Sequence, residues 1–222
     1  MGLDMYLERF PRYKNFKPID IDNVGRYIEW KRNPKAQEYS LSQWCGVKEE
    51  DIPCEEDVNE LAKLYGERFY VWDDEHRYPS EGIEEHVGYW RKANAIHKWF
   101  VEHVQDGEDD CAYHNEVTKD ILEELRDACE EVLTNAVLMK GKVTNGYHLK
   151  GNKWEPIYED GKVVVNPDVC EDVLPCTSGC FFGSTEYDEW YIEDVKYTYE
   201  LCCKLLEETD FDKQMIYYCS SW

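Results

Sequence analysis

The stretch Tyr89–Val101, which reads YWRKANAIHKWFV, is the part of the chain on which we base the fold. It contains no Pro or Gly and many good helix formers, so the sequence predicts a helix that starts near Ile83 and ends by Gly107. On a helix that advances about 100° per residue, one apolar stripe would face the core. Its members are Tyr89, Ala93, Ile96, Phe100 and Val104.

Two polar residues stand out on the flank of this predicted helix. Asn94 and His97 lie beside Trp90, where apolar residues would be expected, whereas Arg91 and Lys98 point to the opposite face. A half-buried polar pair must be hydrogen-bonded, either to the protein or to a ligand. Both alternatives stay open for His97: a core histidine, or one with a ligand-binding or catalytic role.

Composition indicates a folded, acidic protein. The chain has 222 residues, 42% of them hydrophobic and 14% aromatic, which is enough for a sizeable core in one or two domains. No apolar run approaches the roughly 20 residues of a membrane helix, and the start MGLDMYLERF lacks the features of a signal peptide. We therefore expect a cytoplasmic protein without membrane contact, whose ten cysteines are reduced thiols. Their spacing does not match a zinc ribbon, so we expect neither a metal nor another cofactor.

The charge is large and unevenly distributed. A net charge of −23 argues against direct binding of nucleic acid or anionic membranes, although an acidic surface can imitate DNA. Three stretches, 9–19, 86–101 and 132–154, contain no Asp or Glu but several Lys or Arg. If these stretches converge, they would form a locally positive site suited to a small anion, but they can equally lie on separate surfaces.

Helical and strand patterns alternate without a repeating βαβ period. Strands are expected at 2–8, 26–31, 180–182 and 215–219, with a β-like segment at 69–72, and a hairpin of 154–158 with 162–165 around Asp160-Gly161. Helices are expected after the caps Ser40 and Thr118, at 55–65, after Asn166-Pro167, and from Thr185–Asp188 to Glu207. We therefore predict a single α+β domain spanning residues 1–222. In it a mixed sheet, including the N- and C-terminal strands, packs against several helices, and 139–153 forms a mobile insertion.

The sequence contains no dinucleotide-binding, phosphate-loop, zinc-protease or serine-hydrolase motif. The stretch 178–185, SGCFFGST, is uncharged, carries two glycines and precedes a predicted helix start. Such a stretch can present backbone N–H groups to phosphate, or it can simply cap the helix. A small anionic ligand would therefore be bound by Trp90, Arg91, Lys92, Asn94, His97, Lys98, Trp99, Ser178, Gly179, Gly183, Ser184 and Thr185.

Several segments together resemble a family of uncharacterised proteins from bacteriophages, prophages and bacteria. They are MGLDMYL at 1–7, YWRKANAIHKWF at 89–100, GEDDC at 107–111, SGCFFGSTEYDEWYIED at 178–194 and the final SSW. No such motif occurs at 31–82 or 134–165. The resemblance implies a phage accessory protein in the cytoplasm of the bacterial host cell, but no catalytic residue and no activity.

Three functions follow as hypotheses. The first is a non-enzymatic protein that binds a small anionic, nucleotide-like ligand and sequesters a host immune signal. Arg91 and Lys98 point away from Asn94, so one ligand would need a second subunit or a loop to reach them all, which keeps a homo-oligomer among the expectations. The second is an acidic inhibitor of a host protein, for example a DNA mimic. The third is a hydrolase or transferase that uses His97 with Asp4 or Asp188.

Overall fold

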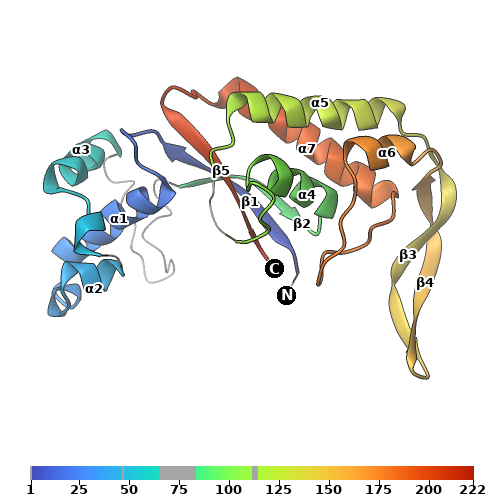
Figure 1. Cartoon of the computed structure of the whole chain (residues 1–222), viewed down its shortest axis with the longest axis horizontal. Helices are drawn as coiled ribbons and strands as arrows, with labels where there is room; N and C mark the ends of the chain where they lie inside the picture. The colour runs from blue at the N-terminus through green and yellow to red at the C-terminus, as the bar shows by residue number, and fades with distance from the viewer. Residues whose placement is uncertain (1, 47, 66–83, 112–114) are drawn as a thin grey trace. The chain divides into compact units, whose positions relative to one another are not determined.

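The computed structural model describes residues 2–46, 48–65, 84–111 and 115–222 (Figure 1). The strands are β1 (Asp4–Pro11), β2 (Glu85–Arg91), β3 (Leu138–Lys150), β4 (Lys153–Val164) and β5 (Gln214–Ser221). The helices are α1 (Pro18–Arg32), α2 (Leu41–Cys45), α3 (Glu55–Tyr65), α4 (Asn94–His103), α5 (Lys119–Asn135), α6 (Asp168–Val173) and α7 (Glu189–Glu208), with 3₁₀ turns at Ala36–Glu38 and Glu49–Asp51.

The α+β class is confirmed, and the two terminal strands share one sheet. Its strand order is β2-β1-β5, and β3 and β4 form a separate two-stranded sheet. Strand pairing is antiparallel: the Lys92 N–H donates to the Leu3 carbonyl at 2.8 Å, and the Arg12 N–H donates to the Lys213 carbonyl at 2.7 Å. The alternation at the N-terminus predicted β1 correctly, because Met5 and Leu7 are fully buried.

Contacts divide the chain into two compact units, each made of separate segments. The first comprises Met1–Leu7, Val87–Thr209 and Ile216–Trp222, and the second comprises Glu8–His86 and Asp210–Met215. A single domain over the whole chain therefore stays a prediction.

In the first unit, helices α5 and α7 lie side by side and pack against each other (Figure 1). Both were expected from their apolar spacing, and both begin at a side-chain cap. Thr118 caps α5 as predicted, accepting from the Ile121 N–H at 3.3 Å. The predicted cap Thr185 of α7 is wrong: Asp188 caps this helix, accepting from the Trp190 and Tyr191 N–H groups. A carboxylate directly before the first turn satisfies these donors better than a hydroxyl three residues earlier.

A glycine lets β2 approach α7 closely. A Cβ atom at Gly88 would lie 2.6 Å from Leu201 Cδ2, closer than real Cβ atoms come, and 3.3 Å from Leu7 Cβ, a tight contact. Beside it, the buried Trp90 donates its indole N–H to Thr198 Oγ1 at 2.9 Å. The strand therefore packs tightly on α7 just before the chain turns into α4.

The long helix predicted from Ile83 to Gly107 is wrong in its first part. Residues Glu85–Arg91 form β2, and the helix α4 covers only Asn94–His103. Within β2, Gly88 and Trp90 are buried and Tyr89 is exposed, which is the alternation of a strand. Helix propensity favoured a helix, but pairing with β1 and burial of Trp90 decide the conformation.

The hairpin is also placed differently from the prediction. Residues 139–153, expected to be an insertion, form β3 and a turn with positive φ at Gly151, while Asp160 and Gly161 lie inside β4 opposite Lys142 and Gly141. Only the first residue of the two-residue turn, Gly151, has a positive φ, which is typical of a type II′ turn, whereas Asp-Gly favours type I′. Mobility of this hairpin stays a prediction.

The strand predicted at 180–182 is wrong. These residues lie in a turn where Phe181 and Gly183 have positive φ values of 66° and 95°. Such backbone angles are incompatible with an extended strand. The short helix expected after Asn166-Pro167 is confirmed as α6.

In the second unit, the strand predicted at 26–31 is wrong, because these residues belong to helix α1. Pro18 opens this helix, the Asp20 side chain accepts the Lys17 N–H at 2.8 Å, and Ile21, Val24 and Ile28 are buried with helical spacing. Residues 26–31 alone are too few to show the period of a helix.

Helices α2 and α3 have the predicted bounds. Ser40 caps α2 and Gly46 ends it at φ 69°, while Val58 and Leu61 bury the apolar face of α3. The β-like segment predicted at 69–72 lies outside the described residues.

No helix in the described ranges has the length and apolar character needed to cross a membrane. The nine cysteines whose side chains the structure describes are all free thiols.

Candidate functional site

A pocket with a volume of about 440 Å³ lies in the first unit, which is within the range of small-ligand sites. The turn between β2 and α4 forms one wall, the 183–188 segment a second, and the first turns of α7 a third. Thr144 and Asn145 of β3 complete the lining. Arg91, Lys92, Asn94, Gly183 and Ser184 all line this pocket, so the basic turn and part of the 178–185 stretch share one concave site. That this site binds a ligand stays a prediction.

Asn94 joins two of these walls. Its side-chain amide donates to the carbonyls of Phe182 and Ser184, at 3.2 and 2.7 Å, and its oxygen accepts the Thr177 N–H at 3.0 Å. The residue is only 4% exposed, so these bonds form in a largely dry environment. Asn94 therefore holds the 177–184 loop against α4. The partners of its buried side-chain amide are groups of the protein.

The basic wall is built on an unusual backbone turn. Lys92 has a φ of 64°, and its carbonyl accepts the Asn94 N–H at 2.8 Å. Gly183 faces this turn with a φ of 95°, and a Cβ atom there would lie 3.1 Å from Lys92 Cβ. A non-glycine residue with positive φ stores backbone strain, which is typical of functional sites. The tight approach places both cationic side chains, Arg91 and Lys92, at the same pocket.

The first turns of α7 supply residues that the sequence analysis missed. Trp190, Glu193 and Asp194 line the pocket, and Trp190 is 43% exposed. Their spacing of three and four residues puts them on one face of the helix, and the buried Tyr191 and Val195 line the pocket beside them. This spacing is present in the sequence, where the stretch was interpreted only as a helix start.

Two of the pocket carboxylates form hydrogen bonds that stabilise the fold. Asp188 caps α7, and burial raises its pKa while the N–H groups of Tyr191 and Trp190 oppose this. Glu186 accepts from the Thr144 hydroxyl at 2.8 Å and the Thr144 N–H at 3.3 Å. The other two carboxyl groups of the lining, those of Glu193 and Asp194, can face a ligand.

Asp194 has the most perturbed carboxyl group in the pocket. Burial raises the pKa of Asp194 to about 7, with smaller contributions from the nearby Glu193 and Asp188. Near neutral pH this group is therefore present in both protonation states, and it can accept a hydrogen bond or donate one. A strongly shifted carboxyl group in a pocket is typical of functional sites.

The other predicted ligand-binding residues do not line the pocket. Trp90 and Trp99 are buried, and Trp99 stacks on His103 with ring centroids 4.2 Å apart. Lys98 forms an ion pair with Glu102 at 3.1 Å, as helix spacing allows. Exposed positions outside the pocket are occupied by Ser178, Gly179 and Thr185. We no longer assign these residues to the site.

The N-terminus of α7 is engaged by the chain itself. Because Asp188 accepts its first free N–H groups, the simple cap describes this helix end better than a phosphate site. The loop carbonyls of Phe182 and Ser184 face Asn94. The expected backbone donors of 178–185 are thus not the main feature of the pocket.

His97 has its own network in the core. It is 1% exposed, its Nδ1 lies 2.7 Å from the Tyr218 hydroxyl, and its Nε2 lies 3.0 Å from Asp109 Oδ1. The Trp222 indole N–H also donates to this Asp109 oxygen, at 3.1 Å. Burial lowers the pKa of His97, against an opposing effect of Asp109. A neutral imidazole can accept a hydrogen bond from the Tyr218 hydroxyl at Nδ1, while its Nε2 lies beside the Asp109 carboxylate without a well-aligned hydrogen bond.

The geometry of the His97 network indicates a structural role. Tyr218 is fully buried, and burial raises its pKa well above the usual value, so no substrate reaches its hydroxyl. The carboxylates expected beside His97 are bonded elsewhere: Asp4 accepts from the Tyr89 hydroxyl at 2.5 Å, and Asp188 caps α7. The pairing of His97 with Asp4 or Asp188 is therefore wrong.

The three carboxylate-free stretches contribute unequally. Stretch 86–101 supplies the basic wall, and 132–154 supplies Thr144 and Asn145 but none of its lysines. Stretch 9–19 belongs to the second unit.

Comparison of the chain with protein-family models, curated proteins and solved structures found no match.

Proposed function

We propose that this protein binds a small, anionic, nucleotide-like ligand in the pocket between the β2–α4 turn and α7. The observation that carries the proposal is the combination of groups around one cavity. Arg91 and Lys92 provide positive charge, Trp190 provides an exposed aromatic face, and Glu193 with Asp194 provides hydrogen-bond acceptors.

Each wall matches one part of a nucleotide. Arg91 and Lys92 suit a phosphate group, which a guanidinium can bind through two parallel hydrogen bonds. The indole of Trp190 offers a stacking surface for a base. Sugar hydroxyls and exocyclic amino groups are hydrogen-bond donors, and the carboxylates of Glu193 and Asp194 accept from such groups. The ligand is therefore expected to combine an anion with several donors.

Replacement of Arg91 by glutamine should weaken binding of nucleotides about tenfold or more. A charge-assisted hydrogen bond contributes about 1.5–3 kcal/mol, and about 1.4 kcal/mol corresponds to a factor of ten. Isothermal titration calorimetry with purine and pyrimidine mono- and dinucleotides measures this. The matched control is Lys98→Gln, because Lys98 belongs to the same basic stretch but pairs with Glu102 away from the pocket. Equal affinities of the two variants would contradict the site.

Replacement of Trp190 by alanine should lower the affinity by about 5- to 100-fold. Stacking of a base on an aromatic side chain contributes about 1–3 kcal/mol. Trp154 of β4 is the control, because it is even more exposed but lies outside the pocket lining. If Trp154→Ala weakens binding as much as Trp190→Ala, the ligand does not occupy the proposed pocket.

For the cellular role, we propose sequestration of a nucleotide signal of the host, which rests on the resemblance to a phage family. Tight binding without turnover would suit that role. The competing function, imitation of DNA, predicts capture of a DNA-binding protein with an affinity that falls steeply with salt. Such a capture, without nucleotide binding by the purified protein, would replace our proposal.

A further inference from the structure

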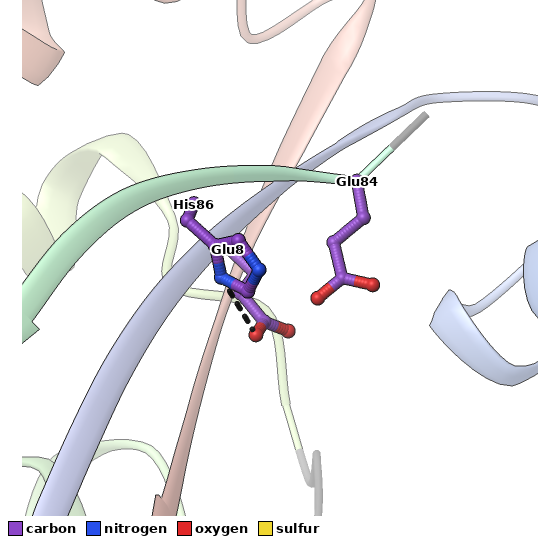
Figure 2. Close-up of side chains that lie close together, drawn as sticks. All are labelled: Glu8, Glu84 and His86. Atoms are coloured by element: carbon purple, nitrogen blue, oxygen red, sulfur yellow. Dashed lines mark ion pairs between the residues drawn. The ribbon is translucent and has the colours of Figure 1, made fainter. Parts of the chain in front are cut away.

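A second cluster of functional groups lies in the other compact unit, at the paired ends of β1 and β2. Figure 2 shows Glu8 of β1 beside Glu84, which directly precedes β2, and His86 of β2. One ligand atom from each side chain lies within 4.8 Å of the other two, and His86 Nδ1 is 3.3 Å from Glu8 Oε1. Residues two apart in an extended chain project to the same side, which explains how Glu84 and His86 reach Glu8 together.

The burial of Glu8 makes this cluster more than a group of surface acids. Glu8 is 4% exposed, whereas the imidazole of His86 remains largely accessible to water. A carboxylate removed from water requires compensating positive charge or hydrogen bonds, and a second carboxylate nearby increases that requirement. Glu8 already has partners in the protein, and a divalent cation between the three groups would add positive charge beside both carboxylates.

We propose that Glu8, Glu84 and His86 bind a divalent transition-metal ion, with Zn²⁺ preferred. Carboxylate oxygens and imidazole nitrogens are both zinc ligands, and three protein ligands leave a position for water. Zinc also binds nitrogen and oxygen donors more tightly than manganese does, and magnesium favours oxygen ligands with its own waters. No metal was expected from the spacing of cysteines and histidines along the chain, and a site here was hidden because Glu8 lies 76 residues before Glu84.

Metal binding is tested on the full chain after treatment with a chelator. Calorimetric titration with Zn²⁺, Mn²⁺ and Mg²⁺ should show one zinc ion per chain, with weaker binding of manganese and weakest binding of magnesium. His86→Ala removes an exposed side chain and should weaken zinc binding at least 100-fold, since even loss of a group that only orients a ligand costs about 10- to 100-fold. Glu84→Gln provides a second variant with unchanged shape.

His148→Ala is the matched control. His148 Nε2 also lies near a glutamate, 3.9 Å from Glu155, but within the described residues no third ligand group joins this pair. Zinc binding by His148→Ala should equal that of the unchanged protein. The proposal is overturned if the unchanged protein takes up no zinc, or if His86→Ala and Glu84→Gln bind it as tightly as His148→Ala does. Circular dichroism of the metal-free variants confirms that each is folded.

Discussion

Replacement of Asn94 by alanine should lower the free energy of unfolding by about 2–4 kcal/mol. The change removes the hydrogen-bond partner of the Thr177 N–H and of the Phe182 and Ser184 carbonyls. Each buried group left unsatisfied costs about 1–3 kcal/mol. Part of that cost is regained where water reaches the exposed Ser184. Urea unfolding followed by circular dichroism measures the effect. Nucleotide binding should fall as well, because the 177–184 loop forms a wall of the pocket.

Asn135→Ala is the control for this experiment. Asn135 is exposed and its side chain donates one hydrogen bond, to the Glu131 carbonyl at 2.8 Å. Its replacement should change the stability by less than about 0.5 kcal/mol. If Asn94→Ala proves equally mild, Asn94 does not hold the loop as the structure indicates.

The second large effect concerns the pH dependence of stability. Because the pKa of Asp194 is raised to about 7 in the folded state, the folded protein keeps this proton at pH values where the unfolded chain has already lost it, so stability falls as the pH rises from 3.8 to about 7. The contribution of the protonated group is complete below the ordinary pKa of 3.8 and is lost as the pH rises through about 7. Asp194→Asn stays neutral, so at pH 8 it should be more stable than the unchanged protein by about 2–4 kcal/mol. At pH 4 the two should be nearly equal.

Urea unfolding at several pH values between 4 and 8 checks this prediction. Asp172→Asn on α6 is the matched control, since Asp172 is exposed. Its stability relative to the unchanged protein should vary little with pH. A constant difference between Asp194→Asn and the unchanged protein across the range would show that Asp194 titrates normally.

Sequence patterns predicted the elements whose local signals agree with their tertiary packing. Ser40 and Gly46 bracket α2 by capping alone, and the apolar spacing of α3 and α5 coincides with their buried faces. The prediction of secondary structure failed where pairing with a distant strand decides the conformation. Residues 85–91 have good helix formers, yet they pair with β1, a partner more than 70 residues away.

The basic half of the pocket was predictable, and the α7 half was not predicted. Arg91 and Lys92 stand out as cations in a carboxylate-free stretch, and glycines mark the turn at Gly183. Whether Asn94 bonds to the protein or to a ligand could not be decided without the position of the 177–184 loop. The shifted pKa of Asp194 depends on burial, which becomes visible only when α7 packs.

The central claim is that the pocket beside Arg91 holds a small anionic molecule. It is tested most directly by native mass spectrometry of the full chain after incubation with the small-molecule fraction of a bacterial lysate. We predict one bound organic anion per chain in the unchanged protein and in Lys98→Gln, released on denaturation, and a clearly lower fraction of liganded protein in Arg91→Gln. An unliganded protein in all three samples, or the same liganded fraction in Arg91→Gln as in the other two, would contradict the account.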